Sequence, residues 1–215
     1  MRTYIEPLRS LFQAHADPAA AEPMAAYMRN QYPYLGIKSA LRHQLENEFI
    51  ANHGLPELED LSPILFDLWS LPEREFQYTA TMLLGKFENK LPPEFIESVQ
   101  NLLTTKSWWD TVDPLAISTV GTHFRRFPDV QDIKLEEWRR SDDFWLRRTC
   151  ILFQLKYKKD TDFDLLKAII QENLGSKEFF INKAIGWALR QYSRTDPDSV
   201  RTFVAETPLT PLSSR

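Results

Sequence analysis

The stretch S-W-W-D-T-V-D-P, residues 107–114, is one copy of a repeat that decides the fold. Each copy has a serine before a helical pattern, and the spacings between these serines are 37, 34 and 35 residues: Ser70, Ser107, Ser141 and Ser176. An aromatic residue follows each serine at a similar offset: Phe76, Trp109, Trp145 and Phe180. A period in the mid-thirties is typical of stacked helical pairs, in which each pair covers the apolar face of its neighbour.

One copy of the repeat carries an acid where the other copies carry a small or neutral side chain. Four residues beyond the aromatic positions stand Ala80, Asp113, Thr149 and Ala184. A carboxylate that breaks the pattern of its own repeat marks a candidate functional position. The alternative is structural, because an aspartate before a proline is a good helix N-cap followed by proline at the first helical position. The spacing leaves both interpretations of Asp113 open.

The rest of the chain has the helix-start signals of an all-α protein. Proline and small polar residues mark further helix starts at Asp17, Ser39, Pro93, Pro128, Asp162 and Asp196. No segment has sustained alternation of apolar and polar residues, so the sequence predicts no sheet. We expect one domain over residues 1–215, built of antiparallel helix pairs. The serine-led helices are expected to line the concave surface, the usual binding face of a solenoid.

Composition excludes several classes of site. The 6 glycines form neither G-x-G-x-x-G nor a P-loop, so no nucleotide-binding loop is expected. The four histidines lack the spacing of a metal site, and we expect no metal or cofactor. One cysteine, Cys150, suits a reducing compartment and a small core residue. No apolar run approaches the roughly 18 residues that span a bilayer, and the first residues lack the pattern of a secretion signal. These features predict a soluble, cytoplasmic protein.

Charge is distributed unevenly along the chain. The net charge of -4 argues against a polyanionic partner, but residues 1–100 have 8 Lys+Arg against 14 Asp+Glu, whereas residues 101–215 have 18 against 16. The fold therefore has the means to gather cations on one face of its second half.

Two groups of residues are candidates for that face. The first is a stripe at helical spacing: Lys183, Trp187, Arg190 and Arg194. The second adds cations from the preceding repeat: Arg148, with Lys156 and Lys158 expected further along the same helix. Aromatic rings among cations suit a surface that meets phosphates and sugars together. The alternative for both groups is an ordinary solvated helix face. Trp108 and Trp109 fit core packing, although adjacent residues of one helix cannot both point inward.

Several blocks of sequence together resemble the AlkD-type DNA alkylation-repair glycosylases, which are built of HEAT-like helical repeats. These blocks, in chain order, are A-E-P-M-A-A-Y-M-R-N (21–30), L-G-I (35–37), L-P-E-R-E-F-Q (71–77), K-S-W-W-D-T-V-D (106–113), I-L-F-Q-L-K-Y-K (151–158) and S-K-E-F-F-I-N-K-A-I-G-W-A-L-R (176–190). The resemblance covers nearly the whole chain.

The resemblance implies a right-handed superhelical solenoid with a concave groove for double-stranded DNA. It implies a monomeric glycosylase of base excision repair that removes purines alkylated at N3 or N7, without a pocket for a flipped base. Asp113 is similar to the catalytic carboxylate of the family, and Trp109 and Trp187 to a pair of tryptophans that contact the deoxyribose. The DNA-contacting residues implied are Tyr27, Arg148 and Arg190, continued by Lys156, Lys158, Lys183 and Arg194.

The chain departs from the family pattern in two places. Arg42-His43 stands where relatives can carry two arginines, which predicts one weaker phosphate contact. The sequence ends at residues 211–215 where relatives continue into another helix, so the last cap of the solenoid is expected to be truncated or disordered.

The residue types fit the chemistry that the resemblance implies. A purine alkylated at N3 or N7 is already cationic and leaves without protonation, so one carboxylate suffices and no histidine is needed. A carboxylate about 4 Å from the sugar, in an effective dielectric near 20, favours the developing cation by roughly 4 kcal/mol. Two other functions stay open: a DNA-binding protein without excision activity, and a protein-binding scaffold without salt-sensitive affinity for DNA.

Overall fold

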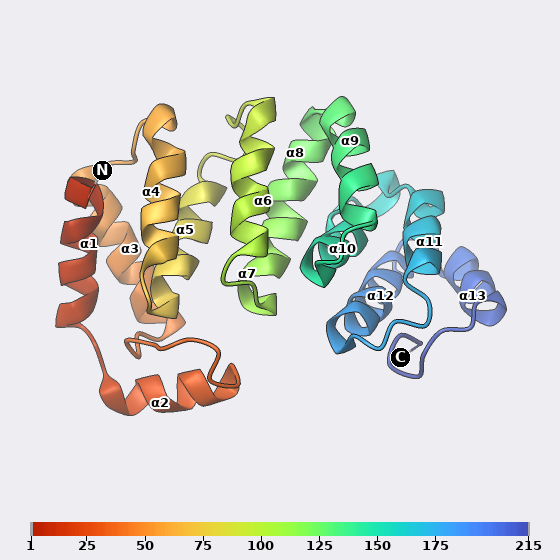
Figure 1. Cartoon of the computed structure of the whole chain (residues 1–215), viewed down its shortest axis with the longest axis horizontal. Helices are drawn as coiled ribbons and strands as arrows, with labels where there is room; N and C mark the ends of the chain where they lie inside the picture. The colour runs from red at the N-terminus through yellow and green to blue at the C-terminus, as the bar shows by residue number, and fades with distance from the viewer. Residues whose placement is uncertain (1, 215) are drawn as a thin grey trace. The chain divides into compact units, whose positions relative to one another are not determined.

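The structure is a computed structural model that describes residues 2–214, and these residues form helices and no strand (Figure 1). The all-α class predicted from the sequence is confirmed. The helices gather into two compact units, Met1–Phe87 and Glu88–Arg215, each a stack of helices, and the prediction of one domain stays a prediction. Among the described helices, none combines the length and the apolar composition needed to cross a bilayer.

The first unit is a helical stack with one helix set apart from it. Its helices are α1 (Arg2–Ala14), α2 (Pro18–Tyr27), α3 (Ser39–His53), α4 (Leu58–Ser70) and α5 (Arg74–Gly85). Aromatic rings fill the core: Phe12 of α1 stacks on Phe76 of α5 with 5.4 Å between ring centroids, and Tyr4 meets Phe49 of α3 edge-on. The short link between α4 and α5 makes them antiparallel neighbours.

The helix set apart is α2, which runs crosswise to the other helices of its unit (Figure 1). Asp17 caps its start as predicted, since the carboxylate accepts the backbone N–H groups of Ala19 and Ala20. Only Ala20 of this helix is buried. Residues 28–38, here called the return loop, lead from α2 to α3. Within it, Gly36 has φ +89, and a Cβ there would lie 2.0 Å from the carbonyl oxygen of Asp17.

This close approach gives a prediction for stability. Gly36→Ala should lower the free energy of unfolding by more than about 2 kcal/mol, because strain in the left-handed region adds to a backbone overlap. Gly54 is a matched control, since it has φ +74 but nothing within 4 Å of its Cβ position. Gly54→Ala should therefore cost only about 1 kcal/mol, from backbone strain alone. Urea unfolding of both variants checks the difference, and equal costs would contradict the packing seen at Gly36.

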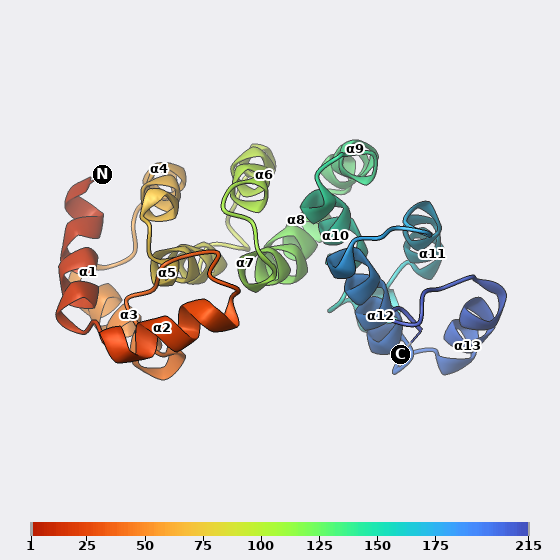
Figure 2. The same cartoon turned by 60° about the horizontal axis from the view of Figure 1, so that its bottom comes forward.

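The second unit is a longer stack of the same kind. A 3₁₀ turn (Pro93–Phe95) precedes α6 (Ile96–Thr104), and the helices that follow are α7 (Trp109–Pro114), α8 (Gly121–Arg126), α9 (Pro128–Arg139), α10 (Phe144–Leu152), α11 (Phe163–Glu172), α12 (Phe179–Tyr192) and α13 (Pro197–Glu206). In Figure 2, α6 and α9 lie in one row, with α8 and α10 in the other. Phe124 joins the rows by contacting Trp138 and Phe153.

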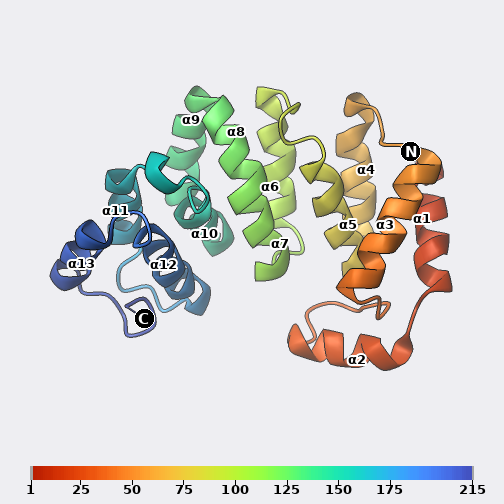
Figure 3. The same ribbon diagram turned by 180° about the vertical axis from the view of Figure 1, so that it is seen from behind.

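Asp113 lies inside a helix and does not cap one. A π-helical stretch, Leu115–Val120, connects α7 to α8, and Figure 3 shows the three segments as one continuous rod. Pro114 has φ -62 and ψ -37, so the chain stays helical through the proline. Proline lacks an N–H and crowds the preceding turn, which accounts for the widened helix that follows it. The N-cap interpretation of Asp113 is therefore wrong.

The repeat register is correct, but the serines do not begin the helices as expected. Ser70 is the last residue of α4, and α7 begins after Trp108. The hydroxyls of Ser141 and Ser176 each accept the backbone N–H two residues later, one turn before α10 and α12 begin. Serine competes for nearby backbone groups and so favours turns just outside helices. The four positions one turn beyond the aromatics are all buried: Ala80, Asp113, Thr149 and Ala184.

Candidate nucleic-acid interface

The carboxylate of Asp113 is held by Arg148 in a two-point ion pair. Arg148 Nε donates to Oδ1 at 2.7 Å, and Nη2 donates to Oδ2 at 2.8 Å. The third nitrogen, Nη1, donates to the carbonyl oxygen of Phe180. Arg148 on α10 therefore links the carboxylate on α7 to the first turn of α12. The paired geometry fixes the plane of the carboxylate, as a fork of two parallel bonds does.

The pair lies at the edge of the packed interior of the second unit. The side chain of Asp113 is 11% exposed and that of Arg148 is 5% exposed. Burial raises the pKa of Asp113, the hydrogen bonds and positive charge of Arg148 lower it, and the charge of Asp110 raises it slightly; the net direction is upward. Asp113 is thus a carboxylate that keeps an accessible edge and depends on its partner to stay ionised.

A cluster of aromatic rings lies beside this pair and reaches it through Phe180. Trp108 packs against Trp145 and Phe180, with ring centroids 5.9 and 5.0 Å apart. Phe144 stacks parallel to Phe180, and the guanidinium carbon of Arg148 lies 5.9 Å from the Phe180 ring centroid. Phe180 gives the ion pair an apolar neighbour, and burial beside it strengthens the electrostatic interaction. Trp108 belongs to this aromatic cluster and is itself only partly buried.

The two candidate tryptophans are both half-buried. Trp109 is the first residue of α7 and lies one turn before Asp113, so the two share a face of that helix. Trp187 is in α12 and lies two turns beyond Phe180, whose carbonyl binds Arg148. Each ring therefore keeps part of its surface available, on a helix that also carries or contacts the ion pair.

The candidate cations lie at several places on the second unit. Lys183 and Arg190 are exposed on α12 with Trp187, as the stripe predicts. Arg194 is exposed in the turn after α12 ends, so it is not on the helix face as expected. Lys156 and Lys158 follow the end of α10, where the sequence had suggested a longer helix.

Arg148 differs most from its expected place, because it is buried beside Asp113 and has all three nitrogens engaged. Lys156 Nζ donates to Ser118 Oγ at 2.7 Å, which ties this exposed lysine to the π-helical stretch.

The residues expected from the first unit lie on α2 and α3. Tyr27, the last residue of α2, is 76% exposed. Arg42 forms an ion pair with the buried Glu46 and lies 4.7 Å from the ring centroid of Tyr78. The His43 side chain is 55% exposed, and its Nδ1 lies 3.0 Å from the same carboxylate. Of the Arg42-His43 pair, the histidine is therefore the more accessible member.

Other reactive groups are structural. Cys150 is buried, and burial raises the pKa of its thiol, which disfavours the reactive thiolate. Among residues 2–214, no three His, Cys, Asp or Glu side chains come together as a metal ion would require.

Comparison with known proteins places this sequence and fold in a family. A family model described as DNA alkylation repair enzyme matches residues 8–215. The chain belongs to the DNA alkylation repair enzyme family. A solved structure described as a predicted DNA alkylation repair enzyme from Enterococcus faecalis is similar to it, with 32% identity, 93% of each chain covered and a TM-score of 0.85. No curated protein matches the sequence.

Membership of the DNA alkylation repair enzyme family gives the chain a role in DNA repair, with DNA as the partner. Sequence reasoning found the carboxylate through the broken repeat but missed its partner's position. One signal was available: Arg148 directly precedes Thr149, the position equivalent to Asp113 in the next repeat, and adjacent repeats pack together.

Proposed function

We propose that this DNA alkylation repair enzyme is a monofunctional glycosylase that hydrolyses the N-glycosidic bond of N3- and N7-alkylated purines in duplex DNA. The observation that carries the proposal is the Asp113–Arg148 pair, an oriented carboxylate at the edge of an aromatic site. The cationic base departs without a proton from the protein. The carboxylate stabilises the positive charge that develops on the sugar and orients the water that attacks it.

Arg148 changes the expected magnitude of this effect. A carboxylate about 4 Å from the sugar contributes roughly 4 kcal/mol at an effective dielectric near 20. The guanidinium on the far side, roughly 8 Å from the sugar, cancels about half of that. The remaining 2 kcal/mol is about thirtyfold in rate. Orientation of the attacking water supplies the remaining rate enhancement, because a positioned general base typically adds at least about a hundredfold.

Trp109 and Trp187 are proposed to contact the deoxyribose of the lesion. Each ring is half-buried, so one surface is fixed by packing while another remains for a ligand. The face of an indole attracts a cation, and this attraction grows as the sugar becomes positive. A site of this kind stabilises the positively charged sugar of the transition state more than the ground state. This suits lesions whose base is already cationic and leaves without protonation.

Release of methylated bases from duplex DNA tests the proposed function directly. The wild-type protein is expected to release 3-methyladenine and 7-methylguanine from methylated duplex DNA and to leave unmodified DNA intact. A protein that binds such DNA but releases no base would be a DNA-binding member without excision activity. Absence of any salt-dependent DNA affinity would instead favour a protein-binding scaffold.

Arg190 supplies a prediction for binding. Arg190→Gln is expected to weaken DNA affinity and to reduce the slope of log affinity against log salt by about 0.9, because one phosphate contact is lost. Arg140→Gln is the matched control, since Arg140 is a 78% exposed side chain just after the end of α9 and pairs with Glu136. The control should leave the slope unchanged. Fluorescence anisotropy with a labelled duplex measures both, and an unchanged slope for Arg190→Gln would remove it from the interface.

A further inference from the structure

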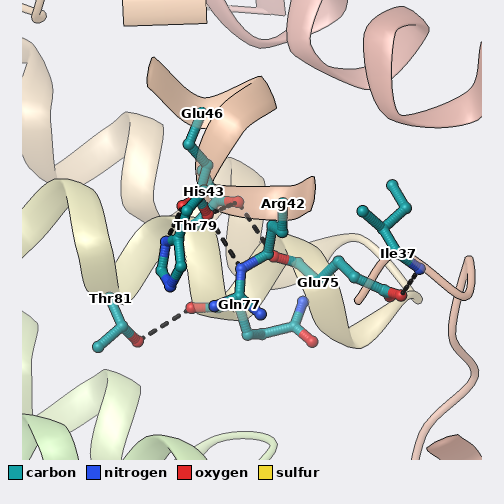
Figure 4. A network of polar contacts seen from close by, with 8 residues as sticks. All are labelled: Ile37, Arg42, His43, Glu46, Glu75, Gln77, Thr79 and Thr81. Carbon is teal, nitrogen blue, oxygen red and sulfur yellow. Dashed lines mark hydrogen bonds and ion pairs between the residues drawn. The ribbon is translucent and has the colours of Figure 1, made fainter. Parts of the chain in front are cut away.

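Two of the sequence blocks that carry the family resemblance meet in the first unit, at Glu75 (Figure 4). Its carboxylate accepts three consecutive backbone N–H groups of the return loop. Oε2 accepts from Leu35 at 3.0 Å, and Oε1 accepts from Gly36 at 2.9 Å and from Ile37 at 3.1 Å. Glu75 is fully buried on α5. A buried carboxylate with this many charge-assisted bonds holds the loop in one conformation.

The return loop in turn holds α2. The backbone N–H of Asp17, the N-cap of α2, donates to the carbonyl of Leu35 at 2.8 Å. Gly36 lies against the carbonyl of Asp17, where no side chain fits. Because Ala20 is the only buried residue of α2, packing alone does little to fix this helix. Its position depends on the loop that Glu75 binds.

Further contacts from α5 fix residues 32–34 of the return loop. The backbone N–H of Arg74 donates to the carbonyl of Pro33, and the guanidinium carbon lies 4.1 Å from the ring centroid of Tyr32. The hydroxyl groups of Tyr34 and Tyr78 are 2.8 Å apart. The start of α5 thus holds both ends of this segment, residues 32–37, while Tyr27 at the end of α2 projects its ring outward.

We propose that Glu75 is a positioning residue that sets the place of Tyr27 on the DNA through the return loop and α2. This inference rests on the proposed function and on the DNA contact of Tyr27 that the family resemblance implies. Glu75 does not touch DNA in this arrangement. Its substitution should act on catalysis only while Tyr27 is present.

A simpler explanation is that Glu75 only stabilises the first unit. A substitution of Glu46 distinguishes this explanation from the positioning of Tyr27. Glu46 is the other buried carboxylate of the network in Figure 4. It accepts from the hydroxyl of Thr79 at 2.8 Å and pairs with Arg42 and His43, so its partners lie on α3 and α5. Glu46→Gln should therefore destabilise the unit without moving α2 specifically.

A double-mutant cycle on the full chain tests the proposal. Glu75→Gln is expected to reduce kcat for base release by roughly tenfold to a hundredfold, as a displaced contact does. In the Tyr27→Ala background the same change should cost no more than about twofold, because the two residues act as one unit. The reductions in kcat caused by Glu46→Gln and Tyr27→Ala should instead multiply in the double variant. Multiplicative losses for Glu75→Gln and Tyr27→Ala would overturn the proposal.

Hydrogen exchange gives a second readout that does not depend on activity. Backbone amides of residues 18–38 should exchange faster in Glu75→Gln than in Glu46→Gln, and equal exchange would contradict the inference. Glu75→Asp, which keeps the charge on a shorter side chain, serves if Glu75→Gln does not fold, and the same comparisons then apply. A wild-type protein that releases no base would refute the proposed function, while the exchange measurement would still decide whether Glu75 holds α2.

Discussion

Asp113→Asn is expected to release 7-methylguanine from duplex DNA at least about a thousandfold more slowly than the wild type. Asparagine has nearly the same shape, but it is neutral and cannot attract a developing cation. DNA affinity should change little, because Asp113 contributes no favourable contact to phosphate. Lesions that depurinate readily should be affected less, since they need less stabilisation of the transition state.

A stability control accompanies this variant, because Asp113→Asn leaves the buried guanidinium of Arg148 without its counter-charge. Breaking one side of a buried pair costs about 3–5 kcal/mol, whereas replacing both partners is often neutral. Asp113→Asn/Arg148→Met should thus be more stable than the single variant and equally slow. A double variant that regains the wild-type rate would show that unfolding, and not lost chemistry, explains the single variant.

The sequence predicted most of the fold because the repeat and the capping residues are local signals. Asp17, Asp162 and Asp196 cap α2, α11 and α13 at the expected places, each accepting backbone N–H groups of the first turn. Such signals act within a few residues, so they survive in one sequence without tertiary context. The serines were misleading for the same reason: their local bonds form turns before the helices and do not start them.

The site was predicted in part. The broken repeat identified Asp113, because the repeat register places equivalent positions in equivalent surroundings. Arg148 was expected on the cationic face, because the family resemblance implies that it contacts the DNA backbone. Its burial depends on a carboxylate 35 residues away and on the carbonyl of Phe180, and no local pattern reports such contacts. The helical proline also escaped prediction, since Asp-Pro normally ends or begins a helix.

Arg148→Met is expected to move the acid limb of the rate profile to higher pH. In the wild type, burial raises the pKa of Asp113 and Arg148 opposes that rise. Without the guanidinium, burial and the charge of Asp110 act unopposed, so the carboxyl group holds its proton to a higher pH. Each unit of further rise lowers the rate on the acid side about tenfold. Base release measured between about pH 5.5 and pH 9 checks the shift.

Two further variants make the assignment specific. Arg148→Lys keeps a positive charge without the two-point hydrogen bonding. The acid limb of its pH–rate profile should therefore lie between those of the wild type and Arg148→Met. Arg147→Met is the matched control, because Arg147 is the adjacent residue of α10 and donates to the carbonyl of Ser141. Its limb should stay at the wild-type position. A profile for Arg148→Met that parallels the wild type would mean that Arg148 does not govern the charge of Asp113.

Stability and rate have opposite pH dependences in Arg148→Met, which separates lost chemistry from lost fold. A carboxyl group whose pKa is higher in the folded state binds its proton more tightly there than in the unfolded chain. Its contribution to stability is therefore complete below the unfolded pKa and is lost as pH rises through the folded pKa. The variant should become less stable over the same pH interval in which its rate recovers. Unfolding would lower the rate as pH rises, so a rate that increases with pH must come from ionisation of Asp113.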